Sequence, residues 1–385
     1  MIPYGRQDIS DEDVEAVVRV LRSDYLTQGP EIEAFEASVA AYVGASHAVA
    51  VNSATSALHI ACAALDIGPG DRVWTSPNSF TASANCARYC GADVDFVDID
   101  TDLNMSVRVL EDKLRRSRVE GTLPRAIVPV DFAGRSCRLA EMRELANEYG
   151  FAIIEDASHA IGATYLDQHV GGHGLSDVTV FSFHPLKIIT SGEGGMAVTH
   201  NAELAQRMRR LRSHGITRDP AQMTHEPDGP WYYQQVELGF NYRLTDIHAA
   251  LGRSQLMRVD DLIARRQQIR MRYDRELARC GLVLPAPDAT GRSALHLYPV
   301  RVPGGLAGGR QQVFTRLRER GIGVNVLYIP IHTQPYYLQF GFQWGDFPEA
   351  EAYYRETVAL PMYAGMSDKQ VGMVIEATLA VVSEA

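Results

Sequence analysis

The chain has 385 residues, a length that suits two domains or one large α/β domain with a smaller appendage. Hydrophobic residues make up 46% of the chain and charged residues 22%, which is the composition of an ordinary globular protein. The formal net charge of −10 argues against a general nucleic-acid-binding protein, because such a protein needs a basic surface.

No apolar stretch approaches the roughly 20 residues of a membrane span, so no membrane segment is expected. The first residues run into polar sequence without the basic and then apolar pattern of a signal peptide, and we expect a cytoplasmic protein. Its five cysteines fit reduced thiols. Cys86 and Cys90 lie four positions apart, but no second Cys or His pair completes a zinc site, so no metal is expected.

Lysine is rare in this sequence. Of the 37 basic residues only Lys113, Lys187 and Lys369 are lysines, and the others are arginines. A mechanism that needs a primary amine therefore has three candidates.

The predicted elements begin with two helices. Ser10 with Asp13 three positions later is typical of a helix N-cap, and a second helix is predicted from Pro30 to the terminating Gly44. Seven short apolar runs then predict buried parallel strands: His47–Val51, Arg72–Thr75, Val94–Val97, Ala126–Val130, Phe151–Ile154, Val178–Phe183 and Gly195–Val198. Most gaps between them can hold a crossover helix, and Leu139–Tyr149 is the clearest of these.

These elements predict an α/β fold with a central, mostly parallel seven-stranded sheet between helices in a large domain of residues 1–250. A smaller α+β domain is predicted for residues 251–385, and the N-terminal segment is expected to touch it. Its expected elements are a long helix, a strand, a helix, a strand and a last helix from Ser367: Leu251–Cys280, Leu295–Val302, Gln311–Arg320 and Val324–Tyr328 precede that last helix. Ligands of such sheets bind beyond the carboxyl ends of the strands.

A polar segment, Asn52–Leu58, follows the first strand and opens a helix. Its small residues and hydroxyl groups at a helix N-terminus could hold a phosphate. A plain Ser or Thr N-cap explains the same residues, and taken alone this second interpretation is favoured.

Two acidic residues, Glu155 and Asp156, end the Phe151 strand. Because side chains alternate along a strand, the two carboxylates should face opposite sides, and one could enter the ligand crevice. A carboxylate there can keep a pyridinium nitrogen protonated, although a solvated charge or a helix cap is an equal alternative. His159 could bind a ligand oxygen or be a structural histidine.

Position selects one of the three lysines. Lys187 lies between a buried strand and a glycine-rich turn, where partial burial would lower its pKa and make it a better nucleophile. Lys113 lies in a charged run that is typical of a solvated helix face, and Lys369 lies among polar residues of the last helix. Phe80 follows another strand end, where it could stack on a planar ring or be an ordinary core residue.

In this order the motifs resemble the DegT-type sugar aminotransferases, a branch of the fold-type I enzymes that use pyridoxal 5'-phosphate (PLP). The resemblance runs from Tyr4 to the last helix. It is carried by five motifs: Asn52–Ala57, Glu155–Ala160, Ser182–Lys187, Gly192–Gly195 and Leu238–Leu244.

The resemblance implies roles for the matching residues. Lys187 would form a Schiff base with PLP and move protons, while Asp156 would pair with the pyridine nitrogen and His159 would contact the phenolic oxygen. Ala54, Thr55 and Ser182 would hold the phosphate, and Phe80 would cover one face of the ring. Asn241 would reach the phosphate site of a neighbouring subunit, which implies a homodimer. Related enzymes with His in place of the lysine are dehydratases, so Lys187 favours a transaminase.

Within the family, the resemblance is to members that move an amino group from L-glutamate to C4 of a UDP-linked 4-keto-6-deoxy-N-acetylhexosamine on a pseudaminic acid route. It implies a set of substrate-binding residues: Tyr4, Tyr25, Leu26, Thr27, Ala54, Ser182, Asn241, Tyr328, Ile329, Pro330 and Ile331. Two alternatives stay open, another dTDP- or UDP-linked keto sugar and a PLP-binding regulator without turnover. A nicotinamide-dependent dehydrogenase is disfavoured because no G-x-G-x-x-G follows the first strand.

Overall fold

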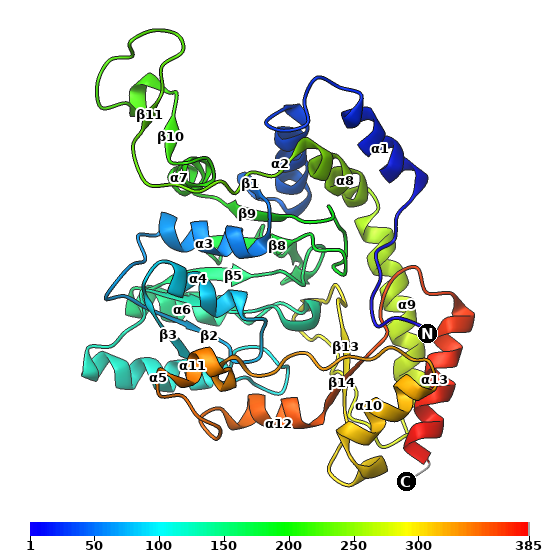
Figure 1. Ribbon diagram of the computed structural model, residues 1–385. Helices are drawn as coiled ribbons and strands as arrows, with labels where there is room; N and C mark the ends of the chain where they lie inside the picture. The colour runs from blue at the N-terminus through cyan, green and yellow to red at the C-terminus, as the bar shows by residue number, and fades with distance from the viewer. Residues whose placement is uncertain (384–385) are drawn as a thin grey trace.

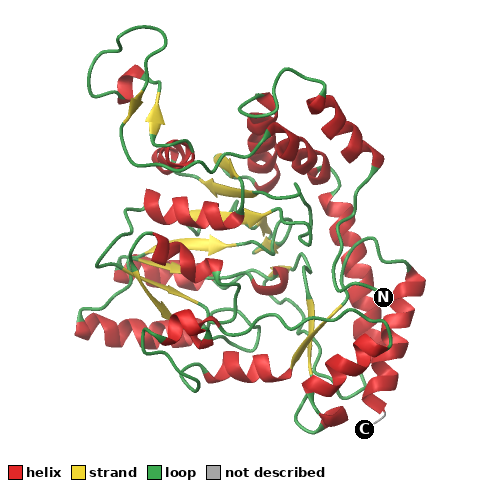
Figure 2. Ribbon diagram, in the orientation of Figure 1, coloured by secondary structure: helices red, strands yellow, loops and turns green. Residues whose placement is uncertain are grey.

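A computed structural model describes residues 1–383 and shows a central sheet covered by helices on both faces (Figures 1 and 2). The seven strands lie in the order β1-β9-β8-β5-β4-β2-β3. Their bounds are β1 His47–Val51, β2 Arg72–Thr75, β3 Asp93–Phe96, β4 Ala126–Val128, β5 Ala152–Asp156, β8 Val178–Ser182 and β9 Gly195–Thr199. The positions of the seven predicted strands are confirmed, with ends that differ by at most two residues.

One strand runs against the others. β9 pairs antiparallel with both β8 and β1, whereas the remaining neighbours are parallel, so the prediction of a parallel strand at Gly195–Val198 is wrong in direction. The physical reason is the connection, because residues 183–194 contain no helix that could carry the chain back across the sheet. This loop contains Lys187.

Apolar side chains alternate across the strands and build two layers of core. One face packs on α3 Ala54–Ala64, α4 Ala82–Tyr89 and α7 Ala202–Arg212. The other face packs on α2 Pro30–Val43, α5 Val107–Glu120 and α6 Leu139–Tyr149. The first helix, α1 Asp11–Leu21, has the predicted capping box, in which the Ser10 side chain and Asp13 bond each other's backbone N–H groups.

The predicted long helix Leu251–Cys280 is wrong, since the chain forms α8 Asp246–Leu256 and α9 Val259–Leu277. The break falls at Met257 and Arg258. Arg258 donates from Nη2 to the buried carboxylate of Asp13 at 2.8 Å and from Nη1 to Asp8 at 3.1 Å. These contacts join residues far apart in the chain, so helix periodicity alone did not reveal the break.

The C-terminal part has its own apolar core, to which Ile2 also contributes. It contains β13 Tyr298–Arg301, α10 Arg310–Glu319, β14 Thr357–Leu360 and α13 Asp368–Ser383, with α11 Pro335–Leu338 and α12 Pro348–Glu356 between them. The predicted strand Val324–Tyr328 is wrong, because only Asn325 forms a single bridge, to Ala359. The predicted domain boundary after residue 250 falls inside α8 and stays a prediction.

Short strand pairs complete the structure: β6 Thr164–Tyr165, β7 Gln168–His169 and β12 Gly291–Arg292 form one small sheet, and β10 Ile216–Thr217 and β11 Gln234–Gln235 form a hairpin. The hairpin projects away from the body of the molecule (Figure 1).

Between residues 1 and 383, no helix is long and apolar enough to cross a membrane. Within the same range, no cluster of three or more His, Cys, Asp or Glu residues is arranged to hold a metal ion.

Candidate active site

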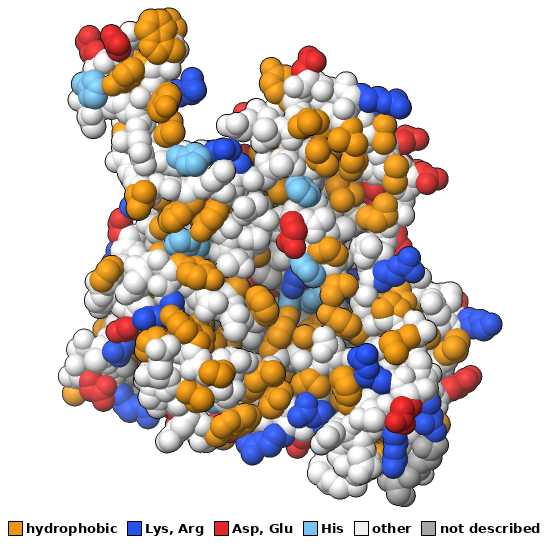
Figure 3. All heavy atoms as spheres, in the orientation of Figure 1, with side chains coloured by type: hydrophobic (Ala, Val, Ile, Leu, Met, Phe, Trp, Pro, Cys, Tyr) orange, Lys and Arg blue, Asp and Glu red, His pale blue; other side chains and the backbone are white. Residues whose placement is uncertain are grey.

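A cavity of about 310 Å³ lies where the carboxyl ends of β5 and β8 meet the start of α3. Histidine side chains and a basic side chain gather at a hollow in the middle of the face seen in Figure 3. Nine of the residues predicted for the site line the cavity: Tyr4, Ala54, Thr55, Phe80, Asp156, His159, Ser182, Lys187 and Tyr328. The structure thus brings together residues from both ends of the chain.

The start of α3 forms one wall of the cavity. Ser53 is the N-cap, and its hydroxyl accepts a hydrogen bond from the Ser56 backbone N–H at 3.1 Å. Ala54 and Thr55, the first two residues of the helix, line the cavity, where N–H groups at a helix start favour an anion. A Cβ on Gly195 would lie 2.5 Å from the Ala54 nitrogen, so glycine lets β9 approach this helix start. The N-cap interpretation is therefore confirmed, and the phosphate interpretation stays a prediction.

The two carboxylates at the end of β5 face opposite sides, as predicted. Asp156 lines the cavity, where its Oδ2 accepts from Ser83 Oγ at 2.6 Å and its Oδ1 from the Ser158 backbone N–H at 3.2 Å. Glu155 is fully buried and accepts from Thr179 Oγ1 at 2.6 Å instead. Of these two carboxylates, Asp156 is therefore the one that faces the cavity.

Lys187 lies in a turn of the loop between β8 and β9, where its backbone N–H donates to His184 O at 2.9 Å. Burial lowers the pKa of Lys187 to about 8, because the ammonium form loses solvation, while the negative charge of Asp156 opposes this shift. Half of the Lys187 side chains are then uncharged at pH 8. An uncharged amine is the nucleophilic form that binds an aldehyde.

We expect the reactivity of Lys187 toward an amine-modifying reagent to rise with a midpoint near pH 8 in the protein without cofactor. Its lowered pKa places the neutral amine there, whereas a lysine in a model peptide has a pKa of about 10.4. Lys369, which is exposed in the last helix, is the comparison site. Peptide mass spectrometry after modification at a series of pH values measures both sites in one sample. Equal midpoints for the two lysines would contradict the burial argument.

His159 is buried beside Lys187. Its Nδ1 accepts from the Ala133 backbone N–H at 3.3 Å, and its Nε2 lies 3.3 Å from the Tyr328 hydroxyl. Burial and then the positive charge of Lys187 hold the pKa of His159 well below its usual range. In the neutral ring Nδ1 is the acceptor, so Nε2 carries the proton and donates to Tyr328. The predicted contact of His159 with a cofactor oxygen stays a prediction.

Phe80 lies at the rim of the cavity with 60% of its surface exposed, and its ring centre is 6.2 Å from that of Tyr328. An exposed phenylalanine over a cavity is costly in water unless a ligand covers it. The core interpretation of Phe80 is therefore wrong, and the stacking interpretation stays a prediction.

Seven predicted site residues do not line the cavity. Tyr25, Leu26 and Asn241 are exposed, and Thr27 forms a backbone bridge with Thr245. Ile329 is exposed, and Pro330 directly precedes the short helix Ile331–Thr333. Ile331 is fully buried in an apolar cluster with Phe96 and Tyr337. The substrate contacts predicted for these residues stay predictions.

Other residues that line the cavity were not predicted: Ser53, Leu58, Ser79, Ala82, Val130, Ser158, His184, Leu186, Glu193, Gly194, His296, Leu297 and Leu327. Most of them lie inside or beside the motifs at the strand ends. Closeness in sequence to these motifs was therefore the signal that could have found them. His296 and Leu297 lie far from every motif in the sequence, and only the folding of the chain places them here.

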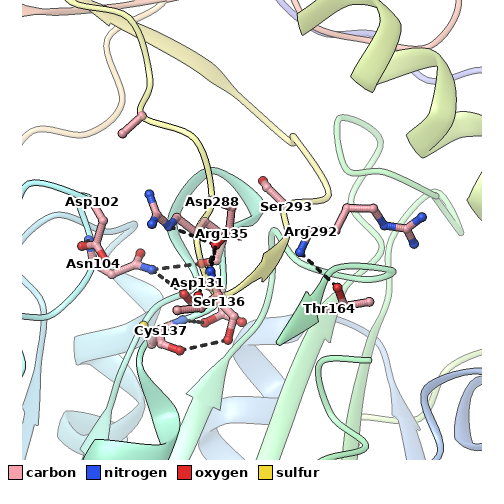
Figure 4. Close-up of polar contacts among 12 residues, drawn as sticks. Asp102, Asn104, Asp131, Arg135, Ser136, Cys137, Thr164, Asp288, Arg292 and Ser293 are labelled. Carbon is pink, nitrogen blue, oxygen red and sulfur yellow. Dashed lines mark hydrogen bonds and ion pairs between the residues drawn. The ribbon is translucent and has the colours of Figure 1, made fainter. Parts of the chain in front are cut away.

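A loop of residues 131–137 contacts both Asn104 (Figure 4) and the cavity residue His159, whose Nδ1 accepts from the Ala133 backbone N–H. Asn104 clamps it, since Nδ2 of Asn104 donates to Arg135 O at 3.0 Å and Oδ1 accepts from the Phe132 backbone N–H at 2.9 Å. Gly134 in this loop has φ +94°, and a Cβ there would lie 2.9 Å from His159 O and 2.9 Å from the Leu295 nitrogen. Only glycine fits between these two backbone segments.

Replacing Gly134 by alanine is expected to lower the free energy of unfolding by about 3 kcal/mol, because a strained φ and a backbone clash add together. Gly121 is a matched control, because it has φ +71° and its Cβ would meet nothing within 4 Å. Gly121→Ala should cost about 1 kcal/mol. Urea denaturation measures both variants, and equal losses would mean that the close approach at Gly134 contributes nothing.

The chemistry of this donor set fits PLP. A helix start with free N–H groups suits a phosphate, a buried carboxylate suits a protonated pyridine nitrogen, and an amine with a lowered pKa suits an aldehyde. The helix start is that of α3, the carboxylate is that of Asp156 and the amine is that of Lys187. All three line one cavity. Such a set is typical of an aminotransferase.

Residues 7–379 match the DegT/DnrJ/EryC1/StrS aminotransferase family, and the chain belongs to this family. It is similar over its whole length to the spore coat polysaccharide biosynthesis protein SpsC of Bacillus subtilis, with 40% identity across 98% of that protein. It is likewise 34% identical to the UDP-4-amino-4,6-dideoxy-N-acetyl-beta-L-altrosamine transaminase of Campylobacter jejuni, again across 98% of that protein.

Among solved structures, PseC of Helicobacter pylori, an aminotransferase involved in the biosynthesis of pseudoaminic acid, matches with a TM-score of 0.92. It is 30% identical, and the match covers all of both chains. The predicted resemblance, the fold-type I α/β fold and the aminotransferase class are therefore confirmed. The chain is a sugar aminotransferase.

Proposed function

We propose that this enzyme uses PLP to transfer an amino group from L-glutamate to C4 of a UDP-linked 4-keto-6-deoxy-N-acetylhexosamine, as on a pseudaminic acid route. The observation that carries the transamination is the shared cavity of Lys187, Asp156 and the start of α3. The names of two relatives, the altrosamine transaminase and PseC, support this sugar.

When bound, PLP withdraws electrons from the carbon that carries the transferred amino group and makes the proton on that carbon acidic. The N–H groups of Ala54 and Thr55 and the hydroxyl of Ser182 would bind the phosphate. Asp156 would keep a proton on the ring nitrogen. Lys187 would hold the cofactor and then, as a free amine, take the proton from Cα of glutamate in the first half-reaction and deliver a proton to C4 of the sugar in the second.

The enzyme loaded with PLP and then with L-glutamate provides a direct test. Excess glutamate is removed, and the enzyme, whose cofactor now carries the amino group, is mixed in separate reactions with UDP-linked and dTDP-linked 4-keto sugars. Mass spectrometry of the sugar products shows which keto sugar receives the amino group. Formation of the UDP-linked 4-amino sugar supports the proposal, and conversion of dTDP sugars alone contradicts the substrate.

Two alternatives predict other results of this test. An aminotransferase for another nucleotide-linked keto sugar has support from the similarity to SpsC, a spore coat polysaccharide biosynthesis protein. It predicts turnover of a different sugar. A regulator that binds PLP predicts no release of 2-oxoglutarate from L-glutamate, which the first half of the experiment measures.

We also propose that the active unit is a homodimer in which Asn241 reaches the phosphate site of the second subunit. Asn241 is exposed in the segment that follows the β10–β11 hairpin. Trp231 of the hairpin is 70% exposed, and Leu238, which follows β11, is 80% exposed. Large exposed apolar side chains are typical of an interface. Mixing Lys187→Ala and Asn241→Ala subunits tests this, because mixed dimers regain one intact site, whereas independent subunits regain no activity.

A further inference from the structure

His296 is a polar residue in the cavity without a role in the site described above. It lines the cavity with only 6% of its surface exposed. Its imidazole makes no hydrogen bond with any residue in the range 1–383, and its Nδ1 is enclosed without a partner. Leaving a buried polar group unpaired destabilises a protein, so such a group calls for a functional reason.

The backbone around His296 is held firmly. The His296 N–H donates to Ala133 O at 2.9 Å, and the Ala294 N–H donates to Gly134 O at 2.9 Å. The buried Arg266 donates from Nη1 to Leu295 O at 3.1 Å and to His296 O at 3.4 Å. The ring itself packs against His159, with ring centres 4.3 Å apart. The imidazole is therefore fixed in place, although its own nitrogens bond nothing.

The charge state of this ring limits what it can bind. Burial holds the pKa of His296 well below its usual range, and the nearby groups His159, Lys187, Arg266 and His184 act in the same direction. A neutral imidazole offers one donor and one acceptor and carries no charge. It suits an uncharged oxygen, whereas the two carboxylates of glutamate are better matched by cations.

His296 lies on a different part of the chain from the helix start, the carboxylate and the lysine that fit the cofactor. Those groups lie on α3, β5 and the loop between β8 and β9, which belong to the sheet and its connections. His296 enters the cavity from the C-terminal part of the chain, together with Leu297, Leu327 and Tyr328. This C-terminal side of the cavity is left for the substrate.

We propose that His296 binds the sugar substrate, with Nε2, the ring nitrogen that is not enclosed, hydrogen-bonded to a hydroxyl or keto oxygen of the sugar ring. The inference rests on the proposed function, because it assumes that a keto sugar enters this cavity. It adds a residue that selects the acceptor and takes no part in loading the amino group from glutamate.

The test compares His296→Phe with the wild-type enzyme in the two half-reactions separately. The phenyl ring keeps the shape of the imidazole and removes its nitrogens, so the melting temperature should stay equal or rise. The kcat/KM for the keto sugar should fall about 10- to 100-fold, which corresponds to one lost hydrogen bond. The rate of loading from L-glutamate should change by less than about twofold.

A second variant, His296→Gln, should recover part of the lost activity toward the sugar, because its amide can make a similar hydrogen bond. His200→Phe serves as a control, since His200 is exposed and bonds Ser46 far from the cavity motifs. Equal losses in both half-reactions, or unchanged sugar kinetics in His296→Phe, would overturn the inference. A wild-type enzyme that converts no keto sugar would instead overturn the proposed function, and the inference with it.

Discussion

Replacing Lys187 by alanine is expected to lower kcat for sugar amination by at least about 10³-fold and to abolish covalent attachment of PLP. Lys187 is the lysine that lines the cavity, and its pKa of about 8 makes it the reactive amine. Reduction with borohydride followed by intact-protein mass spectrometry measures covalent PLP. Steady-state kinetics measures the loss of turnover.

The chain provides a control for this variant. Lys369 is exposed in α13, so Lys369→Ala should bind PLP and turn over at the wild-type rate. Lys113 is a poorer control, because its Nζ donates to Phe96 O at 2.6 Å and forms an ion pair with Asp95. Covalent PLP that persists in Lys187→Ala, mapped to another lysine, would contradict the assignment.

Replacing Asp156 by asparagine is expected to lower kcat by about 10²- to 10³-fold, since an amide keeps the shape of the carboxylate and loses the charge that would hold a proton on the ring nitrogen. A second effect follows from electrostatics. The Asp156 carboxylate raises the pKa of Lys187, so its removal should move the midpoint of Lys187 modification below pH 8.

The pH midpoint of Lys187 modification, measured in the protein without cofactor, separates this charge effect from a loss of structure. Ser83→Ala is the matched control, because it keeps the Asp156 carboxylate and removes one hydrogen bond of 2.6 Å. It should cost about tenfold in kcat and leave the Lys187 midpoint near pH 8. An Asp156→Asn enzyme with wild-type kcat and an unchanged midpoint would show that the carboxylate has neither role.

The sequence predicted the local parts of the structure well. Apolar runs, caps and terminating glycines located the seven strands and the helices α1, α2 and α6, because these signals depend on residues a few positions apart. The same locality explains why the strand ends yielded Asp156, Lys187 and the start of α3. The rule that ligands bind at the carboxyl ends of such strands then joined them into one predicted site.

These sequence patterns did not predict interactions between segments that are distant in the chain. The contacts of Arg258 with Asp8 and Asp13 mark the junction between α8 and α9 in a stretch whose periodicity predicts one helix. The direction of β9 depends on its two neighbours in the sheet, which no apolar run encodes. The helices α11 and α12, of four and nine residues, were not predicted.

By itself the sequence identified the residues of the proposed chemistry, because a strand-end position selects Lys187 among three lysines and the end of another strand supplies Asp156. The tertiary structure alone decided what surrounds them. His296 and Leu297 come from the C-terminal part of the chain, and only folding brings them to the cavity at the edge of the sheet. Gly134 and Ala133 join His159 to the segment of His296 by close backbone contacts, and such contacts leave no periodic trace in a sequence.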